Sequence, residues 1–252
     1  MRKIVLFFLI LLGASVLAKA ATRSDIVVLE ATDQIQYRAQ EAAQNYLLYY
    51  LYPHKESYRE RSKENIRLLG GEIKAVSTNT KKKKTKDILS YFATQEAEAL
   101  TMLRKKPSRE SADTLLETSE IFAEGARSIA RQHDYPFSDE EKMLSLTREM
   151  RVRLEEMVKY YTATRINPKD SSYAAKFKKA ESRFVHGWQM LQRYQYDSNK
   201  EREERRALHR AWKVMQHYLK KQTLFVPAAL TLVTESMGQR LERLGAYHSR
   251  NQ

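Results

Sequence analysis

The sequence IQYRAQEAAQNYLLYYLYP, residues 35–53, carries the pattern that decides the fold. Its apolar side chains recur every three or four residues, which places them on one face of an α-helix. Pro53 ends the segment because proline lacks a backbone N–H and disfavours helical angles in the residue before it. The stretch therefore predicts a long amphipathic helix. Its expected core stripe consists of Ile35, Ala39, Ala42, Ala43, Tyr46, Leu47 and Tyr50.

This helical stretch recurs once further along the chain. A shift of 115 residues places Pro53 on Pro168 without a gap, and a shift of 120 residues places Pro107 on Pro227. Small insertions in the loops of a duplicated unit change the shift in this way, from 115 to 120 residues. Amphipathic helices need no proline, so the matched prolines favour an internal duplication over chance similarity between helices.

Composition extends the helical pattern to the whole chain. Only 7 Gly and 5 Pro occur in 252 residues, and 30% of the residues are charged, which favours helices over strands. Short connections make neighbouring helices antiparallel. We therefore predict an all-α fold with two tandem antiparallel four-helix bundle units, at residues 21–133 and 134–252. The expected helices cover residues 24–52, 54–77, 82–105, 108–132, 139–166, 171–194, 200–222 and 227–248.

The boundary between the units is predicted at HDYPFS, residues 133–138. Pro136 interrupts any helix there. Ser138 and Glu141 have the spacing of a capping box, in which each side chain bonds a free backbone N–H of the other residue at the start of a helix.

Residues 1–20 have the pattern of an export signal. A basic start precedes an apolar run at residues 4–17 and a small-x-small cleavage site at residues 18–20. The run is shorter than the roughly 20 residues that span a bilayer, which favours cleavage over a retained anchor. We expect cleavage between Ala20 and Ala21 and a soluble protein in the periplasm.

Charge and motif content narrow the function. The full chain has a net charge of +14, and removal of Arg2, Lys3 and Lys19 with the export signal leaves +11. In an exported protein, such a positive charge indicates contact with anionic envelope surfaces, small oxyanions or acidic proteins rather than nucleic acid. The chain has no cysteine, which excludes disulfides, thiolate metal sites and a Cys nucleophile. It also lacks Glu-x-x-His, the metal motif of helix bundles, and the common hydrolase and phosphate-loop motifs. We expect no enzymatic activity, no cofactor and no metal.

Two equivalent arginines are the candidate ligand-binding residues. Arg38 and Arg153 occupy the same position in the repeated helix, and the uncharged polar residues Gln34 and Gln44 flank the first of them. A half-buried arginine can hold an oxyanion with its planar guanidinium fork. The alternative is a surface arginine paired with the glutamate three residues further on.

Tyrosines and lysines form a second candidate set. Helical geometry places Tyr49 and Tyr52 off the core stripe, and exposed aromatics beside basic residues form protein or membrane interfaces. Packing between the two bundles is the alternative. A lysine run at the start of the third helix opposes the helix dipole, so it indicates either a bound acidic group or a solvated helix start. The candidate interaction surface comprises Tyr49, Tyr52, Lys81, Lys82, Lys83, Lys84, Tyr194 and Tyr196.

The stretch YRAQEAAQNYLL, residues 37–48, at the centre of an exported four-helix unit resembles the periplasmic sensor domains of the PilJ and NarX type, found in type IV pilus chemotaxis transducers and nitrate sensors. These domains often carry tandem helical modules and a first helix of the form R-x-x-x-S-Q-R, to which Arg38 is the nearest match. The resemblance covers residues 24–248 and implies a sensor in which an arginine binds an anion at a dimer interface.

We expect an exported, sensor-like binding module. Its ligand would be a small anion or an envelope protein partner, either periplasmic or anchored in the membrane. The alternative is a structural adaptor in a periplasmic machine such as a pilus, a secretion apparatus or a flagellum.

Overall fold

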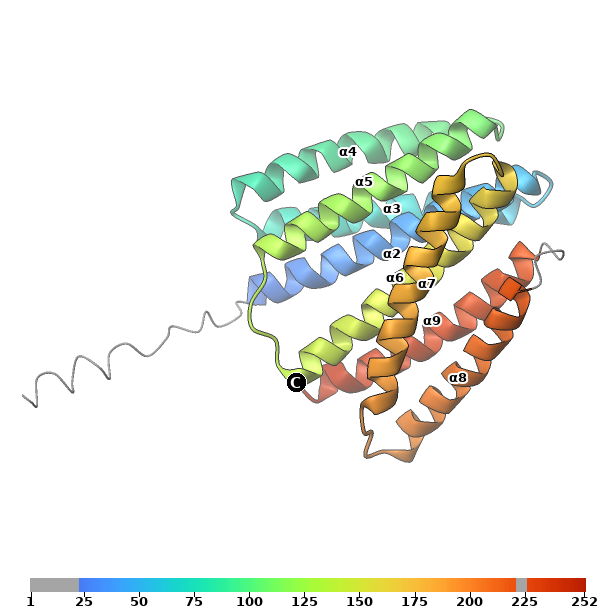
Figure 1. Cartoon of the computed structure of the whole chain (residues 1–252). Helices are drawn as coiled ribbons and strands as arrows, with labels where there is room; N and C mark the ends of the chain where they lie inside the picture. The colour runs from blue at the N-terminus through green and yellow to red at the C-terminus, as the bar shows by residue number, and fades with distance from the viewer. Residues whose placement is uncertain (1–22, 221–225) are drawn as a thin grey trace, which may run out of the picture.

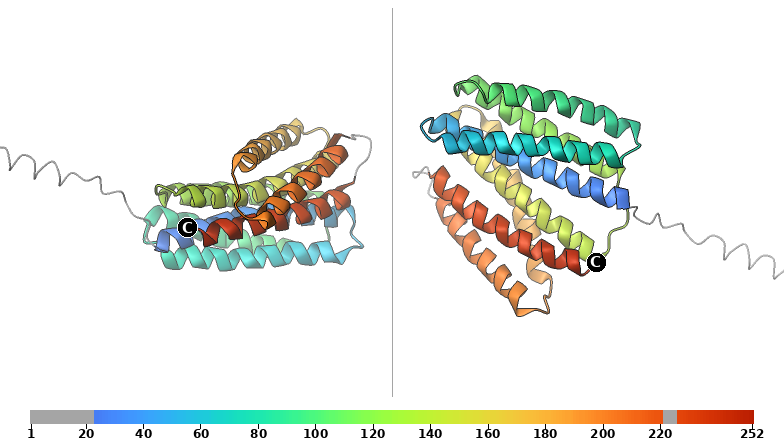
Figure 2. Two further views of the ribbon diagram at one scale, coloured as in Figure 1. Left: turned by 90° about the horizontal axis from the view of Figure 1, so that it is seen from below. Right: turned by 180° about the vertical axis from the view of Figure 1, so that it is seen from behind.

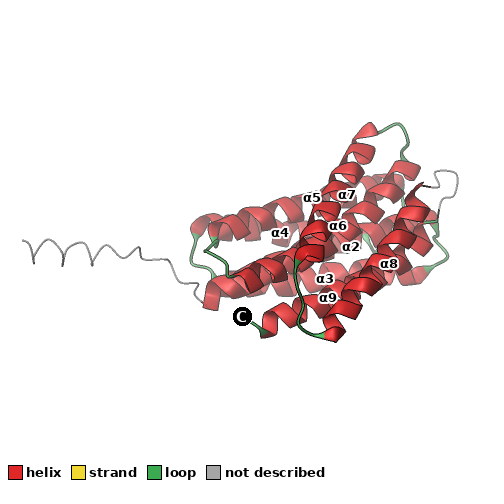
Figure 3. Cartoon of the chain, turned by 60° about the horizontal axis from the view of Figure 1, so that its bottom comes forward, coloured by secondary structure: helices red, strands yellow, loops and turns green. Residues whose placement is uncertain are grey.

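The computed structural model describes residues 23–220 and 226–252, and every regular element in these two ranges is an α-helix (Figures 1 and 3). The all-α prediction is therefore confirmed. The predicted export signal lies outside the described residues. Within them, no helix is both long enough and apolar enough to span a membrane. The helices are α2 (Arg23–Leu51), α3 (Glu56–Asn79), α4 (Lys83–Met102), α5 (Arg109–Gln132), α6 (Asp139–Ile166), α7 (Ser171–Arg193), α8 (Asn199–Lys220) and α9 (Pro227–Arg250).

Local sequence signals set the helix ends. Pro227 occupies the first position of α9, where its missing N–H costs nothing. Ser108 caps α5 by accepting a hydrogen bond from the Ser111 backbone N–H at 3.1 Å. The predicted capping box of α6 is confirmed, with both reciprocal bonds between Ser138 and Glu141 in place.

The first four helices form a closed ring, in which α2 and α4 each pack against both α3 and α5. Six of the seven residues of the predicted α2 stripe are buried, and only Tyr50 is partly exposed. On the opposite side of the core, the rings of Phe92 and Phe122 lie 4.8 Å apart. A Cβ atom at Gly125 would lie 2.5 Å from the Phe92 ring, so this glycine permits the close packing of α4 against α5.

The last four helices form a more open arrangement around a second core. Helix α6 packs against α7 and α9, and α8 packs against α9, whereas the backbones of α7 and α8 stay further apart. Large rings fill the space between them: Phe184 lies 4.7 Å from Trp212, and Trp188 stacks on His209 at 5.4 Å. Figure 2 shows α7 diverging from the other helices of its bundle.

The two bundles meet where α2 packs against α6. The two helices run in the same direction (Figure 1). Where they meet, positions related by the shift of 115 residues lie next to each other. One example is the ion pair between Asp33 and Arg148, which are 115 residues apart and whose Oδ2 and Nη1 atoms lie 3.6 Å apart.

A second equivalent pair, Gln44 and Lys159, makes matching contacts across the junction. Gln44 donates a hydrogen bond to Thr231 Oγ1 in α9 at 3.0 Å, and Lys159 donates one to Ser119 Oγ in α5 at 2.9 Å. Each central helix therefore reaches the fourth helix of the other unit. This reciprocal pattern supports the proposed duplication.

Candidate functional site

The two candidate arginines are neutralised by carboxylates of the chain itself. Arg38 Nε lies 3.8 Å from Glu72 in α3. Arg153 is only 5% exposed and is bonded within its own helix to Glu149 at 2.7 Å and to Glu156 at 2.8 Å. Arg153 therefore pairs with Glu156, three residues further along the helix, which is the alternative to ligand binding given in the sequence analysis. The two guanidinium groups share no partner among the described residues.

The flanking glutamines also differ from a ligand-binding pair. Gln44 is 1% exposed and belongs to the contact between the bundles. Gln34 is half-buried in α2, and no hydrogen bond of its side chain is found in the described part of the chain. Neither contributes to a cavity shared with Arg38 or Arg153.

The prediction that Tyr49 and Tyr196 lie on an exposed surface is wrong. Tyr49 is 4% exposed because its ring packs edge-on against Tyr46 and its hydroxyl donates to Glu56. Tyr196 is 2% exposed, and its hydroxyl bonds to a buried histidine. Tyr52 and Tyr194 remain partly exposed.

The lysine run divides into one anchored and three exposed residues. Lys82 Nζ donates to the backbone carbonyl of Gln132, at the end of α5. That carbonyl has no partner within its helix and attracts positive charge. Lys81, Lys83 and Lys84 are exposed, which fits a solvated helix start.

A histidine missed by the sequence analysis ties together one end of the first bundle. His133 follows α5, and its Nδ1 lies 2.8 Å from the carboxylate of Asp25 at the start of α2. Its Nε2 lies 3.1 Å from the Thr80 hydroxyl in the turn between α3 and α4. With the proton on Nδ1, the ring donates to the carboxylate and accepts from the hydroxyl. We call this group the first histidine clasp.

The second bundle contains the same group. His248 near the end of α9 lies 2.6 Å from Glu140 through Nδ1 and 3.0 Å from the Tyr196 hydroxyl through Nε2. The shift of 115 residues relates both the histidines and the carboxylates of the two clasps. Both hydroxyls belong to side chains of buried residues, so we assign the clasps to holding helix ends together. An acidic residue 108 positions before a histidine in each unit was the available sequence signal.

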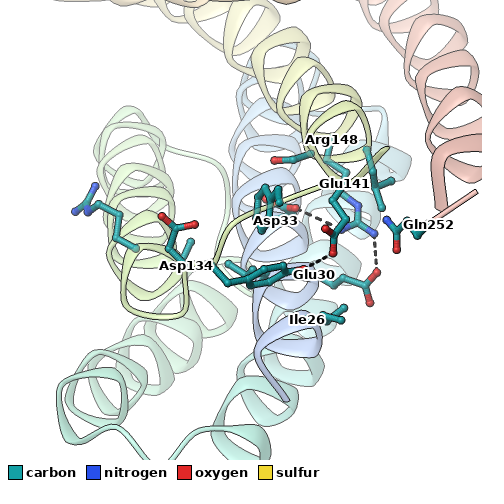
Figure 4. Close-up of a pocket in the computed structure, with 14 residues that line it drawn as sticks. Ile26, Glu30, Asp33, Asp134, Glu141, Arg148 and Gln252 are labelled. Carbon is teal, nitrogen blue, oxygen red and sulfur yellow. Dashed lines mark hydrogen bonds and ion pairs between the residues drawn. The ribbon is translucent and has the colours of Figure 1, made fainter. Parts of the chain in front are cut away.

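The strongest candidate site is a cavity of about 270 Å³ between the two bundles, which we call the junction pocket (Figure 4). Helices α2 and α6, the end of α5 with the connection between α5 and α6, and the last residue of the chain form its wall. Its lining residues are Ile26, Leu29, Glu30, Asp33, Ala130, Arg131, Asp134, Tyr135, Phe137, Glu141, Leu144, Ser145, Arg148 and Gln252.

Opposite charges from the two bundles meet inside the junction pocket. Arg148 of α6 bonds to Glu30 of α2 at 2.7 Å and approaches Asp33 at 3.6 Å (Figure 4). Burial raises the pKa of Asp33 to about 7, Arg148 opposes the rise, and the nearby Glu149 and Glu30 add to it. Asp33 therefore changes its charge near neutral pH.

An aromatic pair forms another part of the pocket wall. The rings of Tyr135 and Phe137 meet edge to face at 4.7 Å. The Tyr135 hydroxyl donates to Glu141 at 2.6 Å. Although burial favours the neutral acid, the hydrogen bonds from Tyr135 and from Ser138 lower the pKa of Glu141. Glu141 is thus held as a carboxylate beside two aromatic rings.

No protein-family model matches the chain, and no curated protein or solved structure matches it either.

The chemistry of the junction pocket is therefore read from its residues alone. Its wall holds four carboxylates against two arginines, in a chain whose net charge is +14. Within the described residues, no three His, Asp or Glu side chains are grouped to hold a metal ion. Carboxylates beside aromatic rings suit an organic cation, which gains both an ion pair and contact with ring faces.

Proposed function

We propose that the protein is an exported helical binding module that recognises a small organic cation in the junction pocket. The observation that carries this proposal is the pairing of Glu30 and Asp33 with a single cation, Arg148, inside a cavity that both bundles line. An amine or guanidinium ligand would compete with Arg148 for these carboxylates.

This position suits a sensor. The ion pairs of Arg148 are also contacts between the two bundles. A ligand that replaces them changes the free energy of one arrangement of the bundles relative to another, which is the requirement for a ligand-driven shift in conformation. The resemblance of residues 37–48 to sensor domains of the PilJ and NarX type implies the same general role, with a ligand of opposite charge.

Calorimetry on the mature protein tests the proposal. Putrescine, arginine and benzylamine serve as probe cations, and nitrate serves as the anion. We expect heat from at least one cation, lost in Asp33→Asn and kept in Asp113→Asn, which removes a carboxylate of α5 outside the pocket. Absence of binding by every cation would reject the cation site. Nitrate binding that disappears in Arg38→Ala would instead favour the arginine site expected from the sequence.

The structural adaptor remains a second candidate because the far end of the first bundle is strongly basic. A cavity of about 520 Å³ there is lined by four cations, Arg59, Arg104, Lys105 and Lys106. Nearby, Lys55 lies 5.5 Å from the centre of the Tyr52 ring. Cross-linking from a residue beside Tyr52 to an acidic envelope protein, unaffected by small cations, would favour this function.

A further inference from the structure

A second cavity, of about 330 Å³, opens between α7 and α8, on the far side of the second bundle's core. It exists because the rings between these helices keep their backbones apart. Among the described residues its wall contains three arginines, a histidine, a tryptophan and a glutamine, and no carboxylate. These residues are Trp188, Gln192, Arg205, Arg206, His209 and Arg210.

Arg205 lines this cavity and is held by backbone carbonyls rather than by a carboxylate. Its Nη1 donates to the carbonyls of Gln192 at 3.1 Å and Tyr194 at 2.5 Å, near the end of α7. Its guanidinium carbon lies 5.6 Å from the centre of the Tyr196 ring. All of its hydrogen bonds to described residues use Nη1, so the charge and the other fork nitrogens are left for an additional acceptor.

His209 and Trp188 line the cavity together. The two rings stack at 5.4 Å, with their planes 12° apart, which fixes the imidazole. The Nδ1 atom of His209 is buried and has no hydrogen-bond partner in the described part of the chain. A buried polar atom without a partner costs about 1–3 kcal/mol. Because this atom has less than 1 Å² of accessible surface, it does not face the open cavity.

Arg206 and Arg210 stand at the rim of the cavity. Arg206 bonds to Glu203 on its own helix, with both side chains more than 60% exposed, and such exposed pairs contribute little and exchange easily. Arg210 is exposed and makes no ion pair with any described residue. Both guanidinium groups are therefore available to a ligand.

We propose that the cavity between α7 and α8 binds a phosphoryl group. Three guanidinium groups, of which only Arg206 is paired with a carboxylate, favour a ligand group that carries more than one negative charge. A phosphate monoester carries about −1.5 to −2 at pH 7. The planar arginine fork matches two of its oxygens at once. The site shares no lining residue with the junction pocket, so its test does not depend on whether the proposed function is correct.

Tryptophan fluorescence and phosphorus NMR on the full mature chain test this site at constant ionic strength. The probes are inorganic phosphate, glycerol 3-phosphate and phosphatidylcholine vesicles with or without phosphatidic acid. We expect Arg210→Gln to weaken binding of the soluble phosphates about tenfold, since one charge-assisted bond is lost. Arg210→Lys, which keeps the charge but not the fork, should fall between this variant and the unmodified protein.

The matched control is Lys213→Gln, which removes the same charge from an exposed position of α8 outside the cavity. It should leave binding within about twofold of the original. Tighter binding to vesicles with phosphatidic acid than to glycerol 3-phosphate identifies a lipid headgroup as the source of the phosphoryl group, and the reverse identifies a soluble ester. Equal losses in Arg210→Gln and Lys213→Gln, or no binding of any phosphate at millimolar concentration, would overturn the proposal.

Discussion

At the scale of single residues, Asp33 connects the junction pocket to pH. Its pKa of about 7 lies far above its ordinary value of 3.8, so the folded protein holds this proton more tightly than the unfolded chain does. The stability that Asp33 contributes is complete below about pH 4 and is lost as the pH rises through 7. Ligand binding in the pocket should therefore depend on pH in the same range, because the ionised carboxylate is the form that attracts a cation.

Asp33→Asn should remove this trend. Relative to the original protein, we expect the free energy of unfolding of the variant to increase steadily between pH 4 and pH 8, as measured by urea titration. Asp139→Asn is the control of opposite sign, because the hydrogen bond from Lys142 lowers the pKa of Asp139. The difference in free energy of unfolding between Asp139→Asn and the original protein should change only at more acidic pH, where Asp139 of the original protein becomes protonated. Parallel curves for both variants would contradict the assignment.

The histidine clasps predict a second effect of single residues. His248→Ala removes two hydrogen bonds and leaves Glu140 and Tyr196 without their buried partner. We expect a loss of about 2–4 kcal/mol in the free energy of unfolding, with faster amide exchange at the start of α6. His217→Ala, at an exposed position of α8, should change stability by less than about 0.5 kcal/mol. Equal effects of the two substitutions would show that the clasp contributes nothing.

At the scale of helices, the close approach of α4 and α5 depends on one missing side chain. Gly125→Ala would normally stabilise a helix interior by roughly 1 kcal/mol. Here the new Cβ atom would lie 2.5 Å from the Phe92 ring, which is 1% exposed and cannot move into solvent. We expect a net loss of about 1–3 kcal/mol from overpacking.

Gly238→Ala is the matched control for this prediction, because a Cβ atom added there in α9 would have no neighbour within 4 Å among the described residues. It should stabilise the protein by up to about 1 kcal/mol. Thermal unfolding followed by circular dichroism would show melting temperatures that move in opposite directions. A higher melting temperature for both variants would mean that Phe92 adapts without cost.

Several helix starts were predictable from the sequence because capping residues and proline act locally. The burial of a side chain was predictable only where it depends on packing within one bundle. Proline and capping residues act on their immediate neighbours, so Ser108, Ser138 and Pro227 mark helix starts in the sequence as they do in the structure. The α2 stripe is likewise a property of one helix. Tyr49 lies off this stripe, yet it is buried because the end of α2 is covered from a second side.

At the scale of the whole molecule, the junction buries charged side chains that a helical pattern assigns to the surface. Glu155 is 5% exposed, and burial together with the nearby Glu41 raises its pKa well above the ordinary value. Lys159 is fully buried beside Glu120 at 2.8 Å. The apolar periodicity of α6 marks only the face that packs into its own bundle, so it does not predict which charged residues the other bundle buries. The junction pocket and its Asp33 were missed for the same reason.

Lys159 provides a test of how the bundles hold together. Burial lowers the pKa of Lys159, and Glu120 opposes this effect, so the charge is kept at a cost. Lys159→Met preserves most of the length of the side chain but leaves Glu120 and the buried Ser119 without this partner, so we expect a loss of about 1–3 kcal/mol in the free energy of unfolding. Lys159→Glu places two carboxylates together and should destabilise the fold by more than about 3 kcal/mol.

Urea unfolding of both variants checks this prediction, and analytical ultracentrifugation shows whether the chain stays compact. Lys176→Glu is the control, since the Lys176 side chain is 43% exposed, whereas Lys159 is fully buried, and it lies 3.9 Å from the same glutamate. A stability of Lys159→Glu equal to that of this control would show that the junction does not depend on the buried lysine.

The side-by-side placement of Asp33 and Arg148 has a consequence for how the two halves recognise each other. These residues occupy the same position of the repeat but carry opposite charges. A chimeric chain built from two copies of the first half would set aspartate against aspartate, and one built from two second halves would set arginine against arginine. The two halves are therefore not interchangeable, because the charges at this position favour packing of one half against the other and oppose packing of either half against a copy of itself.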